Sequence, residues 1–280
     1  MRWAYNDRMQ IAHRVTVSDD QDERRELARL GITAPPGYVA IEVTESNPAW
    51  PAIRDWLALN RPHHFVHTRF SDAELAAARW LSLEPDWHHG YPQPNELEFG
   101  YLEATYDLTE YCHQCGAGLR QKAPFQMRAE PRWGRRSILQ LNWVFDEFFV
   151  TPAVWQAVFE PLGIASRTVT NRRGIELRTV VQLVVAEEVG LQTDGLAQAT
   201  CGSCGRIKYL PVTRGPLPPL TSEPTGHMAK TRELFGSGAR AFREALVSQA
   251  LRRDLRSGGV RGASFTPVAE RDAVGLDLAR

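Results

Sequence analysis

Four cysteines in two matching patterns are the residues of this sequence whose types and spacing most clearly allow chemistry. They form two pairs and are all of the cysteines in the chain: Cys112 with Cys115, and Cys201 with Cys204. In each pair two residues separate the thiols, and a glycine follows the second thiol. Such a turn directs both sulfur atoms toward one point, because glycine readily takes the positive φ that closes it. We call residues 112–116 the first knuckle and residues 201–205 the second knuckle.

The two knuckles together supply four thiolate ligands, which favours a bound zinc ion with tetrahedral coordination. A zinc ion with four protein ligands has no open position for a catalytic water, so we expect it to be structural. Two other interpretations remain open, namely two separate redox-active pairs or two disulfides. Reduced thiols prevail in the cytosol, and a duplicated pair that each time precedes glycine favours the metal.

The two knuckles are far apart along the chain, which determines the structural role that a bound metal would have. Residues 116–200 separate the two pairs, far more than in a single zinc ribbon or finger. The cost of closing a loop grows only with the logarithm of its length, so a metal can join such distant segments. Metal binding, worth on the order of 10 kcal/mol in zinc peptides, would then contribute to folding. We therefore expect a Cys₄ zinc clip between distant parts of the fold.

Histidines in the first third of the chain provide an alternative site. They are His63, His64, His67, His88 and His89. Gathered around a carboxylate, they would make a second metal or acid–base site, and the chain would be a metal-dependent hydrolase. No carboxylate stands at a fixed metal-binding spacing from them, and on a strand His64 points away from His63 and His67. Solvated or structurally satisfied histidines are the simpler interpretation, and we expect no catalytic residues here.

Charged residues suggest further interactions without deciding between them. Asp146 and Glu147 allow three interpretations: a carboxylate pair for acid–base catalysis, an acidic contact for a basic partner, or part of a simple turn. Several arginines near the C-terminus either contact an acidic group or cover a solvated surface: Arg240, Arg243, Arg252, Arg253, Arg256 and Arg261. A zinc-ribbon nucleic-acid binder is the third function considered. The balance of 33 basic and 33 acidic residues argues against nucleic acid and anionic membranes as partners.

The sequence also lacks the signals of a membrane or exported protein. The first ten residues contain no apolar core of a signal peptide, and no run of about 18 apolar residues occurs. We therefore expect a soluble, cytoplasmic protein with no membrane partner.

Hydrophobic periodicity and turn signals predict strands and helices that alternate in the first half of the chain. The expected strands are 11–17, 38–44, 64–70, 97–106, 137–145, 166–170, 175–185, 206–212, 241–247 and 260–268. The expected helices are 21–30, 49–60, 71–81, 151–162 and 249–256. Ser71 and Glu74 have the form of a capping box, and Ser248 is the expected N-cap of the last helix. The turn Asn171-Arg172-Arg173-Gly174 should join the strands 166–170 and 175–185, whose second arm is apolar, into a hairpin.

The order of these strands and helices predicts an α+β fold, with a mixed, mostly antiparallel sheet, peripheral helices and the zinc clip. We divide it into an N-terminal α/β region at 1–96, a zinc-clipped α+β region at 97–268 and a tail at 269–280.

Two parts of the sequence resemble a known family. The two CxxCG motifs are followed by Glu244-Ala245-Leu246-Val247-Ser248 and by Gly259-Val260-Arg261-Gly262-Ala263-Ser264-Phe265-Thr266-Pro267-Val268. Together they resemble the double-CXXCG motif proteins of myxobacteria and relatives, several of which are immunity proteins. The resemblance implies a strand, a helix and a closing strand over 244–268, and a protein that neutralises a cognate toxin without catalysis. It covers the knuckles and the C-terminal segment, but not the first half of the chain.

A protein of this kind acts by covering a partner's surface. Interfaces draw most of their binding energy from a few aromatic or arginine side chains. We expect these anchors at Trp87, Tyr91, Trp133 and the arginines between residues 240 and 261. The first three lie in aperiodic segments near the first knuckle, which a bound metal would make rigid.

Overall fold

The computed structural model describes residues 8–95 and 99–271, which form two compact units. Unit 1 contains the chain up to Ala77 and the short segment Val212–Pro216. Unit 2 contains Ala78–Pro211 and the chain from Leu217 onward. Each unit is described by itself.

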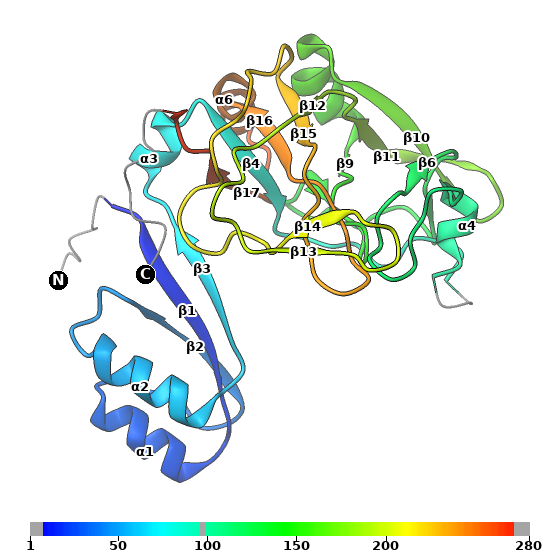
Figure 1. The fold of residues 1–280 in the computed structure, drawn as a ribbon. Helices are drawn as coiled ribbons and strands as arrows, with labels where there is room; N and C mark the ends of the chain where they lie inside the picture. The colour runs from blue at the N-terminus through cyan, green and yellow to red at the C-terminus, as the bar shows by residue number, and fades with distance from the viewer. Residues whose placement is uncertain (1–7, 96–98, 272–280) are drawn as a thin grey trace. The chain divides into compact units, whose positions relative to one another are not determined.

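Unit 1 is a three-stranded antiparallel sheet with two helices on one face (Figure 1). Its strand order is β2-β1-β3, and its elements are β1 (Gln10–Val17), α1 (Gln21–Arg29), β2 (Val39–Thr44), α2 (Trp50–Asn60), β3 (His64–Arg69) and α3 (Asp72–Ala77). Alternate residues of β1 are buried with apolar side chains of α1 and α2, among them Val15, Leu27 and Ile53. The side chain of Asp20 caps α1 by accepting hydrogen bonds from two backbone N–H groups in its first turn. The sequence predicted all five of the longer elements of this unit.

Unit 2 contains two five-stranded sheets and two small two-stranded ladders. The first sheet has the order β7-β10-β11-β9-β8, and the second has the order β12-β15-β16-β4-β17. Within them only the β10–β7 and β12–β15 pairs are parallel. The α+β fold with mixed, mostly antiparallel sheets and peripheral helices is therefore confirmed.

The bounds of the elements in unit 2 follow the chain. They are β4 (Trp80–Pro85), α4 (Tyr101–Thr105), β5 (Tyr106–Asp107), β6 (Arg120–Gln121), β7 (Gln126–Met127), β8 (Ile138–Leu139), β9 (Phe149–Val150), α5 (Pro152–Val154), β10 (Ala165–Asn171), β11 (Glu176–Val184), β12 (Glu188–Val189), β13 (Gln198–Thr200), β14 (Ile207–Tyr209), β15 (Met228–Thr231), β16 (Ala245–Ser248), α6 (Gln249–Ser257) and β17 (Ala263–Pro267). After α5 the chain continues through a π-helical turn, Trp155–Phe159, and a 3₁₀ turn, Glu160–Leu162.

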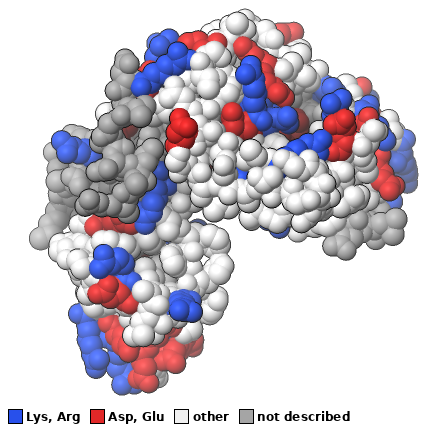
Figure 2. Space-filling model, in the orientation of Figure 1, with Lys and Arg blue, Asp and Glu red and all other residues white. Residues whose placement is uncertain are grey.

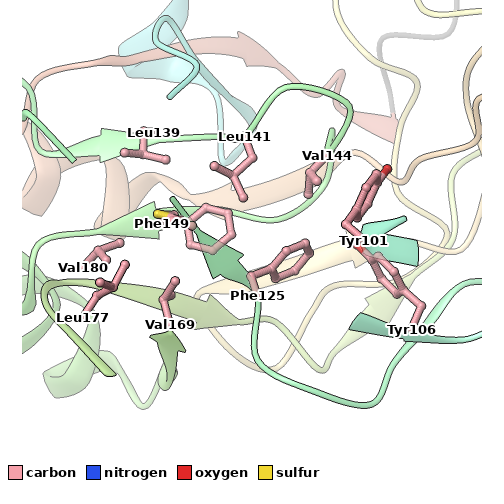
Figure 3. Close-up of a cluster of buried hydrophobic side chains, with 11 residues drawn as sticks. Tyr101, Tyr106, Phe125, Leu139, Leu141, Val144, Phe149, Val169, Leu177 and Val180 are labelled. Carbon is pink, nitrogen blue, oxygen red and sulfur yellow. The ribbon is translucent and has the colours of Figure 1, made fainter. Parts of the chain in front are cut away.

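The core of the first sheet is aromatic. Phe125 and Phe149 are fully buried and meet edge to face with ring centroids 5.4 Å apart, and Tyr106 packs on the other side of Phe125 (Figure 3). Aliphatic side chains from the β10–β11 hairpin and from the 139–144 segment fill the space around these rings. The hairpin, predicted from its apolar second arm and its Asn-Arg-Arg-Gly turn, is present, and the Asn171 side chain accepts hydrogen bonds inside that turn.

The C-terminal strand, helix and strand are also present, but a strand from earlier in the chain lies between the two strands. β16 and β17 both pair antiparallel with β4, so α6 connects two parallel strands across it. Ser248 caps α6 through Leu251, as expected from the sequence. Because β4 belongs to this sheet, the observed division of the chain follows Ala77, whereas the expected boundary followed residue 96. Most of the expected tail, residues 272–280, lies outside the described residues.

Three expected elements are wrong. The helix expected over 71–81 ends at Ala77, and Trp80 and Leu81 belong to β4. Four consecutive residues of β4 are buried, so both faces of this strand are covered, and a short buried run of this kind does not distinguish strand from helix. The start of the expected helix is confirmed, because Ser71 and Glu74 form the expected capping box.

The other two errors are expected strands in which a helix or a positive φ occurs instead. Two further expected strands are present but shorter, since 206–212 forms at Ile207–Tyr209 and 241–247 forms from Ala245 onward. In the strand expected over 97–106, α4 forms instead, with Tyr101 and Thr105 buried four residues apart, a spacing that fits both helix and strand. In the strand expected over 137–145, Ile138–Leu139 forms β8, and Gln140 adds only an isolated bridge to His88. Trp143 has a φ of 69°, which strand geometry excludes.

Candidate metal centre

Each knuckle lies at the end of a small antiparallel ladder. The first is flanked by β5 and β6, and the second is flanked by β13 and β14. In the first, the Gly116 N–H donates to the Cys112 carbonyl at 2.7 Å, and the Cys112 N–H donates to Ala117. The second repeats this pattern, since the Gly205 N–H donates to Cys201 at 2.9 Å. Both glycines have positive φ, 80° and 71°, as the sequence pattern predicted.

The four sulfur atoms gather at one place. All lie within 4.8 Å of one another, and the closest pairs join the two knuckles: Cys112 to Cys201 at 3.8 Å and Cys115 to Cys204 at 3.6 Å. These separations exceed the disulfide bond length of about 2.05 Å by far. A tetrahedral ion with bonds of about 2.3 Å to sulfur would hold its ligands about 3.8 Å apart. The four cysteines therefore fit a metal ion and can hold one.

The protein surroundings favour the thiolate form of the first cysteine in each knuckle. Backbone N–H groups of Cys115 and Gln114 lower the pKa of the Cys112 thiol to about 6. The equivalent N–H groups of Cys204 and Ser203 lower the pKa of Cys201. The first cysteine of each knuckle is thus stabilised as an anion, the form that binds metal.

The two knuckles differ in exposure. Cys112 and Cys115 are buried, Cys201 is partly buried and Cys204 is exposed. Burial raises the pKa of Cys115. Apolar side chains that pack against the first knuckle include Leu234 and Ala241 from the segment before β16. The cluster thus has one side within unit 2 and one side at its surface.

Two cations next to the cluster connect the knuckles further. Lys208 of β14 is buried, and its Nζ donates to three carbonyl oxygens, those of Cys115, Gly238 and Arg240, at 2.6 to 2.9 Å. Arg206, just after the second knuckle, donates to the carbonyl and the carboxylate of Glu110, just before the first. A metal with four thiolates carries excess negative charge, and these cations partly offset it. Neither role was predicted from the sequence, which gives no sign of which lysine is buried.

The histidines do not form a comparable cluster. In the described part of the chain, the cysteine group is the one place where three or more histidine, cysteine or acidic side chains come close enough to share an ion. His64 stacks on His13, whereas His67 lies 3.5 Å from Glu42. His113, inside the first knuckle, packs edge to face on Tyr111. Among the described residues, these histidines pair at most with single carboxylates or aromatic rings and do not converge on one shared site.

The acidic pair after Phe145 has a structural role. The Glu147 carboxylate accepts hydrogen bonds from Lys230 Nζ at 2.6 Å and from Gln182 Nε2 at 2.9 Å. Asp146 lies 3.9 Å from the same lysine. Burial raises the pKa of Glu147. Burial alone would lower the pKa of Lys230, but the charges of Asp146 and Glu147 outweigh it, so the pKa of Lys230 is raised. The pair is therefore an internal ion pair between the two sheets, and Glu147 is not presented to a partner.

An aromatic surface of unit 2 includes one of the expected anchors and two residues that sequence reasoning missed. Tyr91 and Phe99 are 43% and 41% exposed, and both rings contact Trp143, at 4.3 and 4.8 Å between centroids. Phe99 and Trp143 both have positive φ, 56° and 69°. Non-glycine residues in this region are uncommon and often mark functional positions. We call Tyr91, Phe99 and Trp143 the aromatic patch.

Of the other expected anchors, Arg240, Arg253, Arg256 and Arg261 are exposed, whereas the remaining ones are more enclosed. Trp87 and Trp133 are partly buried, lie edge to face at 5.6 Å and pack against the aromatic core. Arg136 covers the Trp87 ring. Arg252 is only 3% exposed and lies over Phe265, so it is not a surface anchor. Arg252 lies three residues, about one helical turn, before buried Leu255 and faces the same core, which explains this error.

The charges on the surface are mixed. On the face that Figure 2 shows, basic side chains lie next to acidic ones and do not form a broad basic area. This distribution provides no support for the nucleic-acid binder. No described helix has the length and apolar character needed to cross a bilayer.

Comparison with known proteins leaves the fold and the site as the evidence for function. No protein-family model matches the chain. No curated protein and no solved structure matches it either.

Proposed function

We propose that this chain is a non-catalytic binding protein whose second unit is organised by one structural zinc ion. The observation that supports this proposal is the convergence of four cysteine sulfurs at separations that fit a tetrahedral ion. The ligands would be Cys112, Cys115, Cys201 and Cys204. Since four thiolates fill a tetrahedron, no position remains for a substrate or a reactive water.

Zinc is proposed over other metals on the chemistry of the ligands. A site with four sulfur ligands suits zinc or iron. Zinc has no redox chemistry, which suits an ion whose role is structural. Bound here, the ion would supply a rigid link between two ladders that are far apart in the sequence. Lys208 and Arg206 would hold the same two segments together from either side.

The partner that we propose is a cognate protein toxin, in line with the resemblance of the motifs to immunity proteins. The contact surface would be the aromatic patch. Tyrosine, phenylalanine and tryptophan are the residue types that contribute most to interfaces, and two of these three side chains are substantially exposed. The patch is also held in position: the Asn142 N–H donates to Gly90, and the Gln140 N–H donates to Trp87. A preorganised patch loses little conformational entropy on binding.

Co-expression with the product of the neighbouring gene tests this function. We expect wild-type protein to rescue growth, and the double variant Tyr91→Ala/Phe99→Ala to rescue poorly although it folds. Tyr38→Ala, at a side chain 78% exposed in unit 1, is the matched control and should rescue fully. Full rescue by the double variant would exclude the aromatic patch as the contact surface. Failure of the wild type would exclude immunity to that gene product.

A further inference from the structure

A charged cavity next to the knuckles has no role in the function proposed above. It has a volume of about 450 Å³, within the usual range of ligand sites. Its charged lining residues are Glu110, Arg120, Glu188, Arg206 and Arg243, and the remainder of the lining is glycine and leucine. Three arginines against two glutamates leave an excess of one positive charge. We propose that this cavity binds an oxyanion, the carboxylate or phosphate group of a ligand.

One of the arginines, Arg206, is held in place before any ligand arrives. Arg206 is fixed by its two bonds to Glu110, at 2.9 and 3.0 Å. Gly118 makes this contact possible, because a Cβ at that position would lie 2.0 Å from the Glu110 carbonyl oxygen and 3.1 Å from Arg206 Nη1. A guanidinium has more donors than these two bonds use, so Arg206 keeps donors for a ligand. A guanidinium group that is held in place recognises a carboxylate or a phosphate through paired hydrogen bonds.

Arg243 supplies a second, independent observation. Its Nε is buried, and among the described residues it has no hydrogen-bond partner. Glu188 lies 3.5 Å away as an ion pair, without hydrogen-bond geometry. A buried donor without a hydrogen-bond partner is unfavourable, and an incoming ligand oxygen would supply that partner.

The cavity also depends on the metal centre for its shape. Glu110, Gly118 and Arg120 lie on either side of the first knuckle, and Arg206 directly follows the second. The metal would therefore hold the two walls together. The site itself does not require a toxin partner, so its test is separate from the growth assay.

Isothermal titration of the purified full-length protein at low salt, with inorganic phosphate and with succinate as separate probes, tests the proposal. We expect saturable binding of at least one probe, and the tighter probe identifies phosphate or carboxylate as the preferred group. Arg243→Gln should weaken binding at least tenfold. Arg120→Gln, an exposed position on β6, should weaken it several-fold and guards against misfolding of the first variant.

The matched control is Arg173→Gln, which removes an exposed arginine from the β10–β11 turn and should leave binding unchanged. Equal weakening in this control would show nonspecific attraction and overturn the proposal. So would the absence of saturable binding of both probes to the wild-type protein, or unchanged binding in both cavity variants.

Discussion

Lys208 shows how a single residue supports the metal centre. Its buried ammonium group donates to carbonyls from three separate residues, of which one is the cysteine carbonyl of the first knuckle. Lysine is rarely buried unless its charge is satisfied, and here all three donors have partners. The sequence around it, Arg-Ile-Lys-Tyr, has the alternation of an ordinary exposed strand. Residue types therefore predicted the metal ligands, whereas the burial of this lysine depends on three carbonyls brought together only by the fold.

Replacing Lys208 with methionine should destabilise unit 2. The change leaves three carbonyl oxygens without their donor, and we expect a loss of about 2–4 kcal/mol. Chemical denaturation measures this loss. Lys122→Met, at an exposed lysine, is the control and should change stability by less than about 0.5 kcal/mol. Equal stability of the two variants would contradict the role of Lys208.

Glu244 should make the protein less stable as the pH rises. Burial raises the pKa of Glu244 from its ordinary value of 4.5 to about 7, and the nearby charges of Glu84 and Asp146 add to this shift. The hydrogen bond from Ser82 acts in the opposite direction and lowers the pKa. Between these values the folded protein keeps a proton that the unfolded chain has lost, so stability falls with rising pH across this window. The full effect is about 3 kcal/mol at most, since the side chain keeps some exposure to solvent.

The variant Glu244→Gln removes this titration. It should match the wild type in stability near pH 4 and exceed it at pH 8, as measured by denaturation at both values. A wild-type protein whose stability rises between pH 4.5 and 7 relative to the variant would contradict the assignment.

At the scale of elements, the sequence predicted those parts in which local signals agree with the fold. The caps and the turn at Ser71, Asn171 and Ser248 all form as expected, because each satisfies backbone groups next to it in sequence. β4 was missed because its apolar run receives its strand conformation from β16 and β17, far along the chain. The same pairing explains why the observed division between the units differs from the expected one.

The glycines that end the two knuckles should respond differently to substitution. Both need positive φ, so Gly205→Ala should cost about 1 kcal/mol. A Cβ on Gly116 would in addition lie 2.3 Å from the Ala239 carbonyl oxygen, whereas Gly205 has nothing within 4 Å. We therefore expect Gly116→Ala to cost more than about 3 kcal/mol and to weaken metal retention. Thermal unfolding of both variants, with metal content measured in parallel, compares them. Equal costs would contradict the close packing of the first knuckle against the 239–241 segment.

At the scale of the whole molecule, the cysteine cluster connects segments within unit 2 alone. Unit 1 has its own core around Val15, Leu27 and Ile53 and contains none of the ligands. The presence of a four-cysteine site could be predicted from the spacing alone, because two CxxCG turns in one chain favour a shared metal over redox pairs or disulfides. The division of the chain into two units could not be predicted, because Val212–Pro216 returns to unit 1 with no sequence signal beyond one glycine and one proline.

Loss of the metal should therefore affect the two units unequally. Replacing Cys201 with serine removes one ligand, and we expect faster amide hydrogen exchange throughout the ladders β5–β6 and β13–β14 and the strands next to them. Unit 1 should keep the protection of the wild type, since its hydrogen bonds lie within its own sheet. Ser203→Ala, in the same knuckle but without a ligand atom, is the matched control. Uniform loss of protection in both units would contradict an effect limited to unit 2.

Metal content is the most direct test of a single zinc ion held by both knuckles. Elemental mass spectrometry of purified protein, with zinc and iron measured together, should give about one zinc per chain and none in a variant that lacks Cys112 and Cys201. Stoichiometric iron would contradict zinc as the metal. Protein that is fully folded with no bound metal, with all four thiols free or paired as disulfides, would contradict the metal centre itself.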